Sequence, residues 1–305
     1  MNKVASIAMS LAVGLLASSA WSHGSDDPLL RPIAPESAAR WLKPQEPARI
    51  FGNTYLVGFG GLNVALIRTS AGLILIDGSV PQGVPAVEDN IRKLGFDLKD
   101  VKLILSTEPH FDHAGGLAAL ARDTGAVVVA SAAAAQVLRR GRSGADDPQA
   151  AWLEPFPAVK KVRVVRDGER IRLGDTIVTA RATPGHTFGS MGWTWRSCEA
   201  GRCAATVFAA SLNPVAADGY RFSDPAHAGL TRAFRRTFEI VRTLPCDLLL
   251  TAHPDQSGGD SKFESLRRHR APNPFLDPRA CMALADKYEK LLDGRLAEEA
   301  TSSGQ

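Results

Sequence analysis

The sequence predicts one α/β domain with β-sheets inside and helices outside. Strand-like and helix-like segments alternate along the chain in two successive halves. Neither an internal repeat nor a linker-like stretch separates these halves. The 305 residues, of which 45% are hydrophobic and 22% charged, are enough to bury a large core.

Turn residues divide the chain into the expected elements. The expected strands are 54–59, 62–69, 73–77, 101–105, 127–129, 162–165, 176–182, 190–195, 204–210 and 247–251. The expected helices are 83–95, 115–122, a segment ending at 140, 226–243, and 278–294 with Asp277 as its cap. Prolines and Asp146-Asp147-Pro148 make 143–160 typical of a flap-like loop. The tail 295–305 is expected to be disordered.

The first 22 residues have the pattern of a cleaved targeting segment. Lys3 is followed by a nearly continuous apolar run over 4–17 and by small residues at 18–20. Cleavage after Ala20 and cleavage after Ser22 fit equally well. We therefore expect a signal peptide over 1–22, a single domain over 23–294, and export to the periplasm or beyond.

Charge and hydropathy limit the classes of partner. No other apolar run approaches the length of a membrane span. The formal charge of +4 is too small and too dispersed to indicate a nucleic-acid partner. No feature indicates an obligate protein partner, and we expect a monomer that acts on a small molecule.

The four cysteines favour structural disulfides in an exported protein. Four cysteines allow three pairings. Cys198 and Cys203 flank four residues between two strand-like runs, as in a hairpin clasped across its turn. Cys246 would then pair with Cys281 and tie the last helix to the body. A metal role is the alternative, but the chain has no Cys-x-x-Cys.

A dense group of metal-binding side chains follows the expected strand 101–105. Residues 106–116 read Ser-Thr-Glu-Pro-His-Phe-Asp-His-Ala-Gly-Gly, which places Glu108, His110, Asp112 and His113 together. Imidazole and carboxylate groups are good ligands for zinc. Two more histidines, His186 and His253, directly follow the expected strands 176–182 and 247–251.

These strand-end histidines differ from the other three. His23, His227 and His269 have no neighbouring ligand residues. A single histidine is more often a hydrogen-bonded structural residue than a metal ligand. Four histidines at equivalent strand ends, beside a carboxylate, indicate a metal centre, because the chemistry of α/β folds lies at strand ends.

The local conformation suggests how these ligands divide between two metals. Pro109 disfavours a helical Glu108, so residues 108 and 110 are expected to be extended and to point to one side. We assign site one to Glu108, His110 and His186, and site two to Asp112, His113 and His253. Asp77, at the end of a strand, is either a partner of a ligand histidine or a simple turn carboxylate.

Residues 50–260 resemble the metallo-β-lactamase superfamily, and more closely the third subclass of the class B metallo-β-lactamases. The resemblance is carried by the segments Ile76-Asp77-Gly78, His-x-Asp-His-x-Gly-Gly, Pro-Gly-His-Thr at 184–187, His253, and the loops 141–148 and 211–214. It implies a four-layer αβ/βα sandwich with the metals held between the sheets. It also implies one or two zinc ions per chain.

Glu108 departs from the family pattern. Most members of the family carry histidine at this position. A carboxylate can bind zinc, but it adds negative charge beside Asp112 and is expected to weaken site one, to favour a harder metal, or to leave that site empty. The ligands of site two, Asp112, His113 and His253, are intact.

The resemblance implies hydrolysis of β-lactam antibiotics. Zinc makes hydroxide available near neutral pH, and Asp112 would orient it toward the lactam carbonyl. Ser211 and Asn213 would hold the substrate carboxylate, and Trp41, Trp152 or Phe156 would pack on its apolar parts. Two alternatives stay open: a lactone or thioester hydrolase of the same fold, and a metal-binding protein that Glu108 has made inactive.

Overall fold

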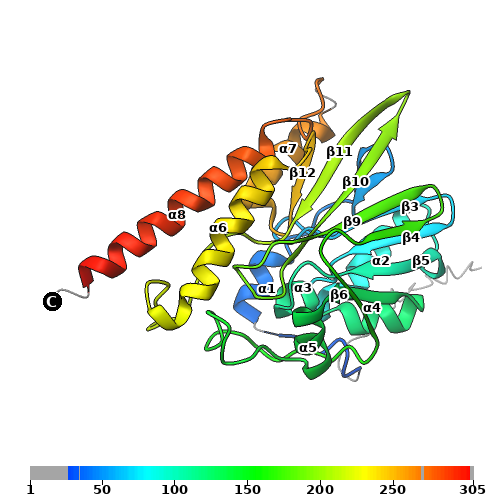
Figure 1. The fold of residues 1–305 in the computed structure, drawn as a ribbon. Helices are drawn as coiled ribbons and strands as arrows, with labels where there is room; N and C mark the ends of the chain where they lie inside the picture. The colour runs from blue at the N-terminus through cyan, green and yellow to red at the C-terminus, as the bar shows by residue number, and fades with distance from the viewer. Residues whose placement is uncertain (1–26, 34, 269–270, 303–305) are drawn as a thin grey trace, which may run out of the picture.

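Two β-sheets packed face to face, with helices on both outer sides, form the body of the protein in the computed structural model (Figure 1). The structure describes residues 27–33, 35–268 and 271–302. The expected signal peptide therefore lies outside the described residues, as do His23 and His269.

Within the described ranges, the first sheet has seven strands and the second has five. The first sheet contains, in spatial order, β1 Ala48–Phe51, β2 Thr54–Leu56, β3 Ala65–Thr69, β4 Gly72–Ile76, β5 Val101–Leu105, β6 Val127–Ser131 and β7 Val162–Val165. The second contains β12 Leu248–Thr251, β11 Arg202–Ala209, β10 Met191–Glu199, β9 Thr176–Ala182 and β8 Arg170–Leu173.

The helices are distributed over the two outer faces. They are α1 Pro35–Trp41, α2 Val84–Lys93, α3 Phe111–Ala114, α4 Leu117–Thr124, α5 Ala132–Arg140, α6 Ala228–Thr243, α7 Gly259–Arg267 and α8 Ala280–Ser302. Short 3-10 helices are η1 Pro81–Gly83, η2 Leu98–Asp100, η3 Pro225–His227 and η4 Pro254–Ser257. Figure 1 shows α6 and α8 on one side of the sandwich and α2, α4 and α5 on the other.

Three apolar layers hold this arrangement together. Strand β3 alternates its side chains: Leu66 packs under the helices of the first sheet, and Ile67 packs between the two sheets. The layer between the sheets includes the buried Trp193 and Phe208. A third layer joins the second sheet to α6 and α8. These layers confirm the predicted αβ/βα sandwich.

Parallel pairing at the centre of the first sheet positions the site. Strands β4, β5 and β6 are parallel, so their carboxyl ends meet at one edge of the sheet. Strand β12 runs parallel to β11 at the edge of the second sheet. The loops that follow β5, β9 and β12 carry the predicted metal ligands.

Both disulfides form as the sequence predicts. Cys198 and Cys203 face each other across the β10–β11 hairpin. Cys246, just before β12, is bonded to Cys281 at the start of α8. None of the described helices combines the length and apolar character needed to span a bilayer.

The prediction of a disordered tail from residue 295 was wrong, because α8 continues to Ser302. Leu292 and Leu296 pack on the third apolar layer. The Glu299 carboxylate accepts hydrogen bonds from the backbone N–H groups of Phe222 and Ser223. These tertiary contacts outweigh the cost of about 1 kcal/mol for a glycine inside a helix, so Gly294 does not end α8.

Several element boundaries also differ from the sequence expectation. Strands β5, β7 and β9 have the predicted bounds. Strands β1 and β8 and helices α1 and α7 were missed. Helix α8 begins at Ala280, two residues later than predicted, and Asp277 accepts a hydrogen bond from the backbone of Arg279 just before it.

Candidate metal centre

The turn after β5 is fixed by a buried carboxylate from the neighbouring strand. Asp77 follows β4 with a left-handed φ of 66°. Its two oxygens accept hydrogen bonds from the backbone N–H and the hydroxyl of Thr107, at 2.7 and 2.6 Å. Asp77 Oδ2 also lies 3.5 Å from His113 Nδ1. This contact supports the role predicted for Asp77 as a partner of a ligand histidine.

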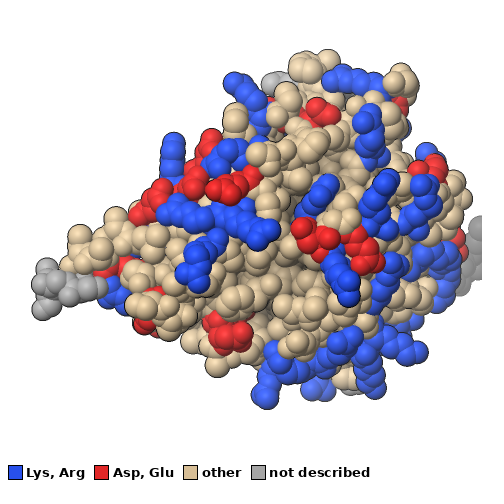
Figure 2. All heavy atoms as spheres, viewed as in Figure 1, with Lys and Arg blue, Asp and Glu red and all other residues tan. Residues whose placement is uncertain are grey.

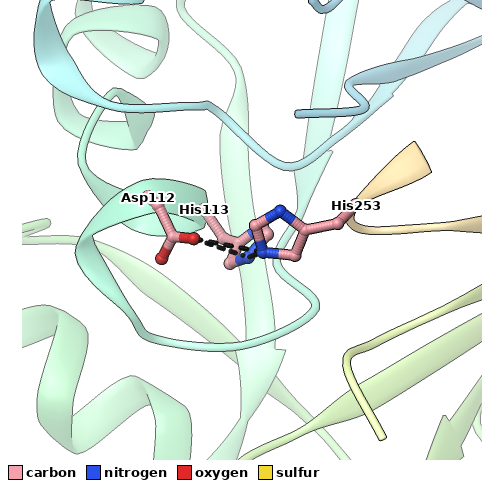
Figure 3. Close-up of side chains that lie close together, drawn as sticks. All are labelled: Asp112, His113 and His253. Carbon is pink, nitrogen blue, oxygen red and sulfur yellow. Dashed lines mark hydrogen bonds and ion pairs between the residues drawn. The ribbon is translucent and has the colours of Figure 1, made fainter. Parts of the chain in front are cut away.

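Asp112, His113 and His253 converge on one point (Figure 3). Asp112 Oδ2 lies 3.2 Å from His113 Nε2 and 3.3 Å from His253 Nε2. The two imidazole Nε2 atoms lie 3.2 Å apart. Among the described residues, this is the one set of three His, Cys, Asp or Glu side chains with ligand atoms all within 4.8 Å.

This spacing suits zinc. In a tetrahedral site with bonds of about 2.0–2.2 Å, neighbouring ligand atoms lie about 3.3–3.6 Å apart. The three separations here are nearly the same. His253 Nδ1 lies 3.1 Å from the Gly61 carbonyl, which fixes the proton on Nδ1 and leaves the Nε2 lone pair facing the centre. The donor set therefore fits the predicted metal.

The charges around His113 favour a cation. Burial opposes the charged forms of Asp112 and His113, but their mutual attraction outweighs it. As a result, the pKa of Asp112 is well below its usual value, and the pKa of His113 is well above it. Glu108 Oε1, at 3.2 Å from His113 Nε2, adds another carboxylate to the same ring.

Glu108 faces the centre and is fully buried, as Pro109 led us to expect. Its Oε1 accepts a hydrogen bond from the Ser211 hydroxyl at 2.7 Å. Its Oε2 has no hydrogen-bond partner among the described residues and lies 3.8 Å from His186 Nε2. Burial raises the pKa of Glu108, but the neighbouring histidines lower it further, so the carboxylate is ionised.

His110 and His186 line one cavity, and the centroids of their rings lie 5.0 Å apart. His110 Nε2 contacts Asp147 Oδ2 at 2.9 Å, so its Nδ1 is left for a metal. His186 Nδ1 lies 2.9 Å from the Asn213 carbonyl, which places the proton on Nδ1 and leaves the lone pair of Nε2 for a metal. The three predicted ligand atoms of site one do not converge as closely as those of site two. The ligand set Glu108, His110 and His186 therefore stays a prediction.

A cavity of about 640 Å³ opens over these ligands. The predicted substrate residues Trp41, Trp152, Ser211 and Asn213 all line it. The Trp41 ring packs against Phe111 and lies beside His253. Phe156 instead packs in the apolar layer beneath the first sheet, so its suggested contact with substrate is wrong.

Ser211 is occupied by other groups. Its side chain is almost completely buried, its hydroxyl donates to Glu108, and the amide of Gln256 donates to it at 3.1 Å. A hydroxyl has one proton, so Ser211 cannot donate to Glu108 and to a substrate carboxylate together. In this structure the Ser211 hydroxyl is therefore a partner of Glu108.

Sequence reasoning missed several polar residues of the site. Asp147 and Gln149 come from the flap-like loop, and the Gln149 amide lies 3.2 Å from His186 Nε2. Gln256 lies three residues after His253. The Asp-Asp-Pro in the loop was the one available signal for Asp147, whereas nothing in the sequence distinguished Gln149 or Gln256.

Comparisons with known proteins identify the family of this chain. A family described as the metallo-beta-lactamase superfamily matches residues 57–253. A solved structure described as the first B3 metallo-β-lactamase with an active-site glutamic acid is 52% identical, with a TM-score of 0.84, over 90% of this chain and 99% of that one. The Rm3 metallo-β-lactamase is 43% identical, with a TM-score of 0.85, over 88% and 100%.

More distant relatives extend the comparison. The subclass B3 metallo-β-lactamase BJP-1 of Bradyrhizobium japonicum is 35% identical, with a TM-score of 0.78, over 87% of this chain and 99% of that one. The acyl-coenzyme A thioesterase MBLAC2 of Gallus gallus is 30% identical over 148 residues, which span 42% of this chain and about half, 51%, of that protein. The matched family covers well over half of the sequence, and the protein belongs to the metallo-β-lactamase superfamily.

Proposed function

We propose that the protein is an exported, zinc-dependent β-lactamase that hydrolyses the amide bond of the β-lactam ring. The observation that carries this proposal is the set Asp112, His113 and His253 at zinc-like spacing, of which Asp112 and His253 line the cavity. The similarity over nearly the full length of a B3 enzyme with an active-site glutamic acid supports the same activity.

Bound zinc would supply a Lewis acid and lower the pKa of water to about 7. The protein would orient the reactants around it. Asp112 Oδ2 faces His113 and His253, and Asp112 Oδ1 has no hydrogen-bond partner among the described residues. That oxygen is placed to accept a proton from an attacking water and to hold the water in line with the substrate carbonyl.

The substrate carboxylate needs partners other than Ser211. Asn213 lines the cavity, and its side-chain NH2 group can donate hydrogen bonds to a carboxylate. Arg40 and Lys43 line the mouth of the cavity and supply positive charge. We assign the carboxylate to Asn213 and these cations, and the apolar part of the substrate to Trp41 and Trp152.

The metal content of site one follows from the same contacts. Glu108 and His186 face each other across a gap, and His110 offers Nδ1 from beside Asp147. We propose one firmly held zinc at site two and a second, more weakly held zinc at site one. We also propose a monomer that is secreted to the periplasm after removal of residues 1–22.

Hydrolysis of a chromogenic cephalosporin by the mature protein tests the proposal. We expect turnover that a chelator abolishes and zinc restores, and near-background turnover for Asp112→Asn. The matched control is Asp146→Asn, because Asp146 is in the flap-like loop but does not line the cavity. Zinc-loaded protein that leaves penicillins, cephalosporins and carbapenems intact would refute a β-lactamase function.

A thioesterase is the second candidate, and the partial match to the acyl-coenzyme A thioesterase favours it. The ligand set serves either acyl group, so the same preparations should be assayed on acyl-coenzyme A and on a lactone. Chelator-sensitive thioester turnover without cephalosporin turnover would replace the lactamase proposal. Zinc binding with no turnover of any of these substrates would indicate a metal-binding protein.

A further inference from the structure

The outer face of the second sheet is only partly covered by helices. Helix α6 packs over β11 and β12, where Val207 and Leu249 belong to the third apolar layer. Beyond Leu244 and Pro245, at the end of α6, the outer faces of β8, β9 and β10 form the floor of a cleft of about 500 Å³. This cleft shares no lining residue with the metal-site cavity.

Strand register brings three arginines to the edge of this cleft. Arg170 of β8 is opposite Thr179 of β9, and Thr179 is opposite Thr194 of β10. Arg181 and Arg196 are each two residues further along their strands, on the same outer face. Because β9 and β10 are antiparallel, Arg181 and Arg196 lie on opposite sides of the pair of threonines, and Arg170 lies on a third side.

No acidic side chain neutralises these arginines. Within the described residues, Arg170, Arg181 and Arg196 make no ion pair at 4 Å or less, although exposed arginines elsewhere do, such as Arg163 with Glu169. Asp175 is the one acid that lines the cleft. Its Oδ1 already accepts hydrogen bonds from the Ser70 backbone and the Thr176 hydroxyl.

Arg181 provides a second, independent indication of a ligand. Its Nε is buried and has no hydrogen-bond partner among the described residues. A buried donor without a partner is destabilising, so such groups are normally satisfied. Figure 2 shows basic side chains gathered on the face where Figure 1 places β9 and β10, beside a smaller acidic group.

We propose that this cleft binds a small oxyanion that carries an apolar body. The guanidinium groups and the hydroxyls of Thr179 and Thr194 would hold the phosphate, sulfonate or carboxylate group. Ile177, Leu244 and Pro245 line the same cleft and would contact the apolar part. The site is separate from the metal centre and does not depend on β-lactam hydrolysis.

Phenyl phosphate is a suitable probe, with inorganic phosphate as the comparison. Because oxyanions can also bind zinc, the readout must be local. In ¹⁵N-labelled, zinc-loaded mature protein, we expect saturable shifts of the Arg181 Nε–H signal and of the Thr179 and Thr194 amides. Inorganic phosphate should move the same signals with weaker affinity, because it lacks the apolar body.

Arg181→Gln and Arg196→Gln should each weaken phenyl phosphate binding about tenfold, as expected for one lost charge-assisted contact. Arg172→Gln is the matched control, because Arg172 is exposed on β8 beside Arg170 but does not line the cleft. An unshifted Arg181 Nε–H signal, or equal weakening by Arg172→Gln, would overturn the site. Equal affinity for the two probes would overturn the apolar-body assignment.

Discussion

Replacing Ser211 with alanine tests whether this serine serves Glu108 or the substrate. The bond that is lost joins Ser211 Oγ to Glu108 Oε1 over 2.7 Å and is fully buried. Hydrogen bonds to a charged group contribute about 1.5–3 kcal/mol. The Ser211 backbone N–H lies 3.4 Å from the same oxygen and remains. We therefore expect the lower part of this range, a loss of about 1.5–2 kcal/mol in the free energy of unfolding.

The assay is urea unfolding of the zinc-free mature protein, since bound metal would hold Glu108 in place by itself. Ser106→Ala is the matched control. The Ser106 hydroxyl is equally buried but has no hydrogen-bond partner among the described residues, so its removal should cost far less. In a double-mutant cycle, Glu108→Gln and Ser211→Ala should show a coupling energy of about 1 kcal/mol.

Two results would refute this reasoning. Equal midpoints for Ser211→Ala and the wild type, at the same dependence on urea, would show that the bond to Glu108 contributes nothing. A large rise in KM for cephalosporins without a change in stability would show that Ser211 binds the substrate and does not mainly support Glu108. Either result would also remove the reason for assigning the substrate carboxylate to Asn213.

Three further predictions concern the metal. Glu108→His should raise the zinc bound per chain in dilute metal, measured by elemental analysis; equal stoichiometry would show that glutamate is an adequate ligand. Asp147→Ala should weaken zinc binding at site one about 10–100-fold in a competition titration, because Asp147 orients His110, while Asp146→Ala should not. Zinc affinity should rise with pH above about 6.5, because His113 must lose its proton to bind metal and its pKa is raised; a flat profile would contradict this.

The sign of the pH effect on stability follows from the same pKa shifts. The raised pKa of His113 stabilises the zinc-free fold fully below about 6.5, and this contribution is lost as pH rises through the folded-state value. The lowered pKa values of Asp112 and Glu108 stabilise the fold above about 4, and this is lost as pH falls. These three groups together favour the zinc-free fold in weak acid, and thermal unfolding of Asp112→Asn and the wild type across pH would measure their contribution.

The sequence best predicts those elements whose secondary structure depends on neighbouring residues in the chain. Strand β5, Val101–Leu105, is an apolar run bounded by polar turns, so its limits are correct. Strand β8 has four residues, two of them arginines, and is a strand because it pairs with β9. The last turns of α8 are held by contacts between Glu299 and the segment after Tyr220, which no local pattern reveals.

The site divides in the same way. The convergence of Asp112, His113 and His253 was predictable because each comes shortly after a strand, and strand ends meet at one edge of a sheet. Their supporting partners come from distant loops: Asp147 is 37 residues from His110, and Gln256 is 45 residues from Ser211. A partner of this kind is chosen by the three-dimensional arrangement, and its sequence position carries no periodic or motif signal.

Glu108 belongs to a motif that the sequence reveals, but its effect depends on partners that only the fold brings together. As a residue in a motif it is one substitution, but in the fold it brings a full negative charge into a buried space that already holds Asp112. The neighbouring imidazoles and the Ser211 hydroxyl stabilise that charge, and the Gln256 amide donates to Ser211 from behind. Because the Ser211 proton is used in this way, we expect glutamate at position 108 to affect substrate recognition as well as metal binding. A variant that restores histidine at 108 should therefore change both properties together.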